Sequence, residues 1–165
     1  MPFELRPYPV PTLQPDGEYL QTAWQRSVYP IAKRLGVEMR LPTVSPQPYT
    51  RLAFEGMEFA KDHGAADAYH DGVMRAFFQR SEDIGQLDVL TRVGVEAGLE
   101  PSAFREALEL HHYSERVAEL LRHATEEVQV TGVPLFVIGD VVLRGVQSRQ
   151  GLEAVIDQQL QSAGG

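Results

Sequence analysis

The chain contains no cysteine among its 165 residues. It can therefore form no disulfide bond, no zinc–thiolate site and no thiolate nucleophile. Exchange of disulfide bonds requires a thiolate that attacks sulfur, and no other side chain replaces it in that step. The polypeptide by itself is therefore predicted to be redox-inert.

Long apolar runs and a surplus of positive charge are also lacking. No apolar stretch reaches the length of a membrane-spanning helix, and the N-terminus has no basic region followed by an apolar one. We therefore expect a cytoplasmic location and no membrane partner. The formal net charge of −8 argues against binding to nucleic-acid phosphates, so no nucleic acid partner is expected.

Common catalytic and metal-binding motifs are missing too. The sequence has no Gly-x-Ser-x-Gly elbow, no phosphate-binding loop and no dinucleotide fingerprint, so no catalytic residue is assigned. A helix that begins by residue 112 would align His112, Glu115, Glu119 and His123 on one stripe. The apolar residues of this segment point the opposite way, which is typical of a solvated face, so no metal site is predicted.

The C-terminal part carries a strong hairpin pattern. Val133 precedes Pro134, which favours extended backbone, and an apolar run follows to Ile138. Gly139-Asp140 is a two-residue turn signal before a second apolar run that starts at Val141. A helical pattern begins near Ser148, which suits the N-cap position.

The rest of the chain is mainly helical by pattern. Alternation over residues 3–6 predicts one further strand, which Pro7 ends. Leu20, Trp24 and Val28 begin one apolar helix face that continues to Leu35. Similar faces follow, built on Ala53/Met57/Ala60, Ala66/Tyr69/Val73/Ala76/Phe77, Leu87/Leu90/Gly94/Ala97, a short helix from Pro101 to Leu108, Val117/Leu120/Leu121/Ala124/Val128 and Leu152/Val155/Ile156/Leu160.

The order strand, tight turn, strand, glycine loop and helix, opened by Val-Pro, resembles the closing half of a DsbA-like thioredoxin fold. Further segments that match are Pro2-Phe3-Glu4-Leu5-Arg6-Pro7, Tyr69-His70, Phe77-Phe78, Asp83-Ile84-Gly85, Gly98-Leu99 and Phe104-x-x-Ala107-Leu108. The resemblance implies an α/β fold with a large helical insertion over residues 13–128. Residues 1–12 and 129–165 would form the thioredoxin-like part. The first strand and helix of the family, which carry Cys-x-x-Cys, have no counterpart in this sequence.

The resemblance also implies a substrate-binding site. In the family the Val-Pro bond is cis, and the residues that match its binding loop are Gly132, Val133 and Pro134. An extended peptide or glutathione binds there. In the glutathione-using relatives a second loop helps to hold the ligand, and its counterparts are Gly145, Gln147 and Ser148, beside a helix N-terminus that can receive an anion. The competing interpretation is that Ser148 only caps that helix. No cofactor is expected, with glutathione as a candidate ligand.

The missing first strand would lie in the middle of the thioredoxin sheet. Its neighbours would then show open backbone edges, and we expect something to fill that place. Either a second copy does so in a homodimer formed by strand exchange, or the sequence is part of a longer gene product.

The resemblance and the absence of cysteine leave three candidate functions. In the first, the chain is a member of the protein disulfide oxidoreductase family that lacks the redox motif. The second is a non-catalytic peptide-binding or assembly module that uses an open sheet edge. The third is a relative of the glutathione-dependent hydroxychromene-carboxylate isomerase and the kappa-class glutathione transferase.

Overall fold

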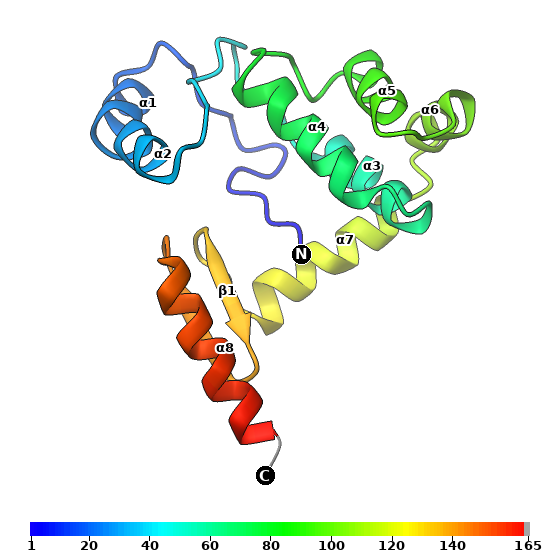
Figure 1. Cartoon of the computed structure of the whole chain (residues 1–165). Helices are drawn as coiled ribbons and strands as arrows, with labels where there is room; N and C mark the ends of the chain where they lie inside the picture. Colours follow the sequence, from blue (N-terminus) through cyan, green and yellow to red (C-terminus); the bar gives the residue numbers. More distant parts are fainter. Residues whose placement is uncertain (164–165) are drawn as a thin grey trace. The chain divides into compact units, whose positions relative to one another are not determined.

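A computed structural model describes residues 1–163 and divides the chain into two compact units. The helical unit consists of Pro2 and residues 4–121, and the hairpin unit of Met1, Phe3 and the residues from Arg122 onward. Figure 1 follows the chain through the helices of the first unit to the hairpin and the last helix. Among the described residues, no helix combines the length and the apolar character needed to cross a membrane.

The helices and the hairpin follow the order that the sequence patterns predict. The helical unit contains α1 (Glu18–Ala23), the π-helix η1 (Trp24–Val28), α2 (Tyr29–Leu35), α3 (Arg51–Asp62), α4 (Ala66–Phe78), α5 (Leu87–Glu96), α6 (Pro101–Glu109) and α7 (Ser114–Arg122). The hairpin unit contains the π-helix η2 (His123–Glu127), β1 (Leu135–Ile138), β2 (Val141–Arg144) and α8 (Arg149–Ala163).

The first helical stretch differs from the single helix that its apolar spacing predicts. Three helical segments, α1, η1 and α2, follow one another without a break in the chain. Pro30, in the first turn of α2, has no N–H to donate to the carbonyl group four residues earlier. The wider hydrogen-bonding pattern of the π-helix directly before it is consistent with that missing donor.

The strand predicted over residues 3–6 is not formed, and this part of the prediction is wrong. The sheet found among residues 1–163 contains β1 and β2 alone. A strand requires a hydrogen-bonded neighbour, and none of the described strands lies beside residues 3–6. Instead, Glu4 accepts a hydrogen bond at 2.9 Å from Nη2 of Arg51 on α3, and residues 4–12 group with the helical unit.

The core of the helical unit depends on small residues where helices meet. A Cβ atom at Gly94 of α5 would lie 2.7 Å from the Phe104 ring of α6. A Cβ atom at Gly72 of α4 would lie 2.7 Å from Cγ1 of Val93 on α5. Gly56 of α3 likewise accommodates the Tyr69 ring of α4. Hydrogen in place of a methyl group thus allows α3, α4, α5 and α6 to pack closely.

Two carboxylates are buried in this unit, Glu55 and Glu58 on α3. Nδ1 of His111 lies 3.1 Å from Glu55 Oε1. Arg116 Nε donates to Glu58 Oε2 at 3.0 Å, and Lys61 Nζ donates to its other oxygen at 2.5 Å. Because an unpaired buried charge costs several kcal/mol, these partners fix the start of α7 against α3.

Asp62, one turn further along α3, completes this contact at the surface. It accepts hydrogen bonds from Nη1 of Arg116 at 2.9 Å and from the Tyr113 hydroxyl at 3.0 Å. The hydrogen bond from Arg116 is the main reason that the pKa of Asp62 lies below its usual value, and the one from Tyr113 adds to it.

We predict that Gly94→Ala destabilises the helical unit. The new methyl group would overlap the fully buried Phe104 ring, and the cost of overpacking exceeds the gain in helix propensity. The expected net loss is on the order of 1 kcal/mol in the free energy of unfolding, measured with urea. The exposed neighbour Val95 provides the control, because Val95→Ala should change stability by less than about 0.5 kcal/mol.

We also predict that Asp62 contributes to the loss of folding stability at acidic pH. Because its pKa is lower in the folded chain, its stabilising contribution is present above the unfolded pKa and is lost as the pH falls through the folded value. Asp62→Asn should therefore show a smaller fall in Tm than the wild type between about pH 5 and about pH 2.5. Asp71→Asn, an exposed change on α4, is the control, and equal slopes for Asp62→Asn and the wild type would contradict the assignment.

Candidate functional site

The hairpin forms where the sequence predicts it. β1 pairs antiparallel with β2, with Ile138 opposite Val141 on either side of the turn. Gly139, the first turn residue, has a φ of 60°, the left-handed region that a two-residue turn of this kind requires. α8 packs against β1, and Gln159 of α8 accepts a hydrogen bond at 3.3 Å from the backbone N–H of Asp140 in the turn.

The two predicted binding segments meet at the end of the hairpin away from this turn. The Val133–Pro134 peptide bond is cis. The N–H of Gly145 donates to the Pro134 carbonyl at 2.9 Å and extends the ladder beyond Leu135 and Arg144. The hairpin therefore brings residues 132–134 and 145–148 together.

The outer edge of β1 carries backbone groups without a partner strand. In an antiparallel pair, residues alternate between those that bond across to the partner and those whose backbone groups point outward. The pairs Ile138–Val141, Phe136–Leu143 and Pro134–Gly145 are of the first kind. The backbone N–H and C=O groups of Leu135 and Val137 therefore point outward, away from β2. No strand among the described residues lies on that side.

The two faces of the hairpin differ in their exposure. Phe136 and Leu143 share the face that is half-buried, whereas Val137 and Val142 share the opposite face and are 52% and 49% exposed. An exposed apolar face beside an open edge is suited to an extended peptide, which can pair its backbone with β1 and place apolar side chains on the valines.

The side chains of the second segment are engaged within the unit. Gln147 Nε2 donates to the carbonyl groups of Arg144 at 2.9 Å and Gly145 at 3.1 Å. Ser148 Oγ accepts from the N–H of Gly151 at 3.0 Å, so it is the N-cap of α8. The capping interpretation of Ser148 therefore has direct support, and the N–H and C=O groups of Gly145 are likewise engaged within the unit, by Pro134 and Gln147.

Comparison with known proteins identifies the family. The sequence profile of the DSBA-like thioredoxin domain matches residues 2–157. The chain belongs to the DSBA-like thioredoxin domain family. It is 45% identical over 161 residues to the uncharacterized protein YwbO of Bacillus subtilis, an alignment that covers 96% of this chain and 80% of that protein.

A solved structure shows the same fold. A probable DsbA oxidoreductase of Streptomyces coelicolor superposes with a TM-score of 0.70 over 98% of this chain and 73% of that chain, at 21% identity. The DsbA-like thioredoxin fold inferred from the sequence is therefore confirmed. In this DSBA-like domain it is dominated by helices and has a small two-stranded sheet.

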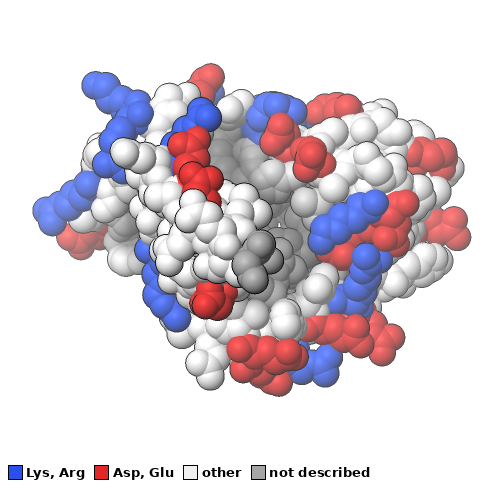
Figure 2. Space-filling model, turned by 60° about the horizontal axis from the view of Figure 1, so that its bottom comes forward, with Lys and Arg blue, Asp and Glu red and all other residues white. Residues whose placement is uncertain are grey.

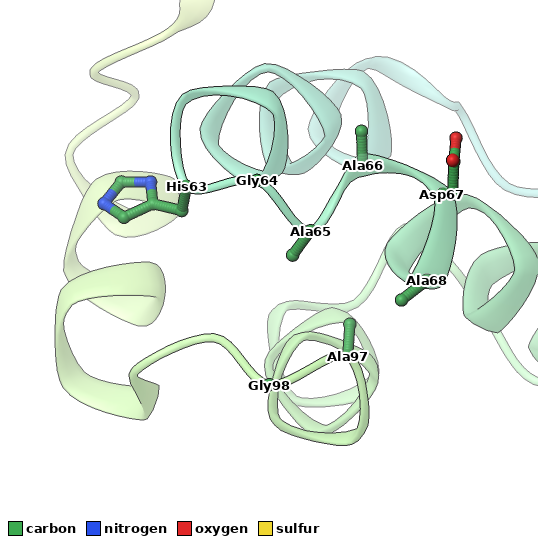
Figure 3. A pocket seen from close by; sticks show the side chains of 8 residues that line it. All are labelled: His63, Gly64, Ala65, Ala66, Asp67, Ala68, Ala97 and Gly98. Carbon is green, nitrogen blue, oxygen red and sulfur yellow. The ribbon is translucent and has the colours of Figure 1, made fainter.

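A separate hollow lies in the helical unit, between the α3–α4 and α5–α6 turns. It has a volume of about 580 Å³ and is lined mostly by Gly and Ala, with His63 and Asp67 at its two ends (Figure 3). His63 is occupied elsewhere, because its Nδ1 lies 2.8 Å from the Phe59 carbonyl oxygen and its ring stacks on Phe59. The lining therefore has no arrangement of nucleophile and base.

The histidines show no metal centre within the described residues. No group of three His, Asp or Glu side chains is placed to hold an ion there. α7 begins at Ser114, so His112 lies outside the helical stripe that would have aligned it with Glu115 and Glu119. Nδ1 of His123 lies 2.9 Å from the Glu127 carboxylate.

Sequence reasoning missed the pair of His111 and Glu55, which lie 56 positions apart. The pair joins α3 to the segment after α6, and no pattern within either segment signals it. His111 has a φ of 52°, but Ser81 and Gln129 also adopt positive φ, so this conformation does not single it out.

We predict that Ser148→Ala weakens the first turn of α8 by about 1 kcal/mol, because the Gly151 N–H loses its acceptor. Amide exchange of Gly151, measured by NMR, should become faster. Ser148→Asp should keep exchange slow, since aspartate also caps helices. Ser162→Ala, near the other end of α8, is the control, and an unchanged Gly151 rate in Ser148→Ala would contradict the cap.

Proposed function

We propose that this chain is a DsbA-like scaffold that binds an extended peptide, and that it performs no thiol chemistry by itself. The observation that carries the proposal is the unpaired outer edge of β1, directly after Pro134. The absence of cysteine supports the second half, because no side chain of the chain can form a mixed disulfide.

An extended peptide fits the edge better than glutathione does. Leu135 and Val137 offer outward N–H and C=O groups over the length of a short strand, and the exposed Val137 and Val142 side chains lie beside them. A glutathione site would rely more on residues 145–148, where the Gln147 amide and the Ser148 hydroxyl already have partners.

A non-catalytic assembly module is the second candidate, and the same open edge favours it. In that case the occupant of the β1 edge would be a strand of a fixed partner or of a second copy, rather than a passing substrate. Sedimentation distinguishes a homodimer from a monomer that binds peptide, because a homodimer formed through this edge would have twice the mass. Added peptide would compete with this dimerisation and would lower the measured mass.

The test uses labelled insulin B chain whose thiols are alkylated, so that only non-covalent binding is measured by anisotropy. Val137→Pro should weaken binding by at least about tenfold, because proline removes an outward N–H from the β1 edge. Val142→Pro is the matched control, since Val142 lies opposite Val137 and its backbone points to the outer edge of β2. Circular dichroism checks that both variants remain folded.

Equal loss of binding in the two proline variants, or no binding by the wild type, would overturn the peptide-binding half of the proposal. The redox half is tested separately, by reduction of insulin with dithiothreitol. The pure chain should leave the rate at the background value, and any acceleration would contradict the proposed inertness.

A further inference from the structure

The positive charges of the helical unit are distributed unevenly. Between Tyr19 and Val37 the sequence contains Arg26, Lys33 and Arg34 and no acidic residue, although the whole chain carries a net charge of −8. All three cations are exposed. On the face shown in Figure 2, Lys and Arg side chains stand out along the left edge, with acidic side chains among them.

These three cations have no ion pair among the described residues. Elsewhere α3, α5, α6 and α7 each carry an ion-paired basic side chain, whereas Arg6, Arg40, Arg75 and Arg122 show no ion pair among the described residues either. The paired residues are Arg51, Lys61, Arg92, Arg105 and Arg116. The dipole at the C-terminus of α2 favours Lys33 and Arg34, but Arg26 lies two turns earlier. These three charges therefore have no ion pair within the described fold, and the acidic residues Glu18 and Glu38 lie at the two ends of the segment.

The apolar side of the same segment is already covered. Trp24 is 7% exposed, and its ring lies 5.3 Å from that of Tyr29 and 6.0 Å from that of Phe78 on α4. Insertion into a bilayer requires a free apolar helix face, and this face packs inward. The apolar groups left at the surface are isolated, with Tyr19 70% and Leu35 55% exposed.

We infer that the exposed side of α1, η1 and α2 is a docking surface for an acidic polypeptide segment. Arg26, Lys33 and Arg34 supply the charge, and Tyr19, two helical turns before Arg26, supplies an apolar contact. Arg26 and Lys33 are seven residues apart, about 10 Å along a helix, so they match carboxylates spaced over two turns of a helix or three residues of a strand. This surface shares no residue with the β1 edge.

The test uses a labelled peptide of Glu and Leu and its counterpart of Lys and Leu, with anisotropy as the readout. The wild type should bind the acidic peptide only, and binding should weaken steeply between about 0.05 and about 0.5 M salt as charges are screened. The combined change Arg26→Glu, Lys33→Glu and Arg34→Glu should raise the Kd at least about tenfold.

The matched control is Arg75→Glu, Arg122→Glu and Arg144→Glu, which changes the net charge equally at exposed positions outside α1, η1 and α2. Its affinity should stay within about threefold of the wild type. Equal loss in both triple variants, or equal binding of both peptides, would overturn the inference. Charge-dependent binding to phosphatidylserine vesicles without peptide binding, or self-association lost only in the first triple variant, would also overturn it by naming a different occupant.

Discussion

The packing of the helical unit depends on two acidic side chains that lie inside it. Glu55 and Glu58 are buried on α3, and most of their partners come from the segment where α6 ends and α7 begins. A buried carboxylate without a hydrogen-bond donor or a counter-charge is strongly destabilising, so the contacts with His111 and Arg116 hold these two residues in place. α7 then leads the chain towards the hairpin unit, and its start is held by these contacts rather than by apolar packing alone.

Much of this architecture could be predicted from local patterns. Turn chemistry at Gly139-Asp140 and the run after Pro134 were sufficient for the hairpin, because both signals act over a few residues. The prediction of a strand over residues 3–6 failed because alternation indicates which side chains share a face but does not provide the neighbouring strand that a sheet requires. The contact of His111 with Glu55 joins distant segments, and no periodicity encodes such a pair.

The candidate site was likewise predictable only where the signal is local in the sequence. Ser148 was recognisable as a cap from its place before a helical pattern, and its hydrogen bond to Gly151 agrees. The meeting of Pro134 with Gly145 follows from hairpin register, which the turn length sets. The exposure of Val137 and Val142 could not be predicted, because it depends on which face α8 covers, and side-chain alternation alone leaves both faces equivalent.

Binding in this fold can be separated from chemistry for a physical reason. Disulfide exchange needs a sulfur atom with a suitable thiolate fraction, and one substitution or omission abolishes it. Recognition at β1 needs outward backbone groups, which every residue except proline supplies, and a register that the hairpin sets by itself. The proposed peptide binding therefore does not depend on cysteine, whereas disulfide exchange does. Fold kinship alone carries neither property over to this chain.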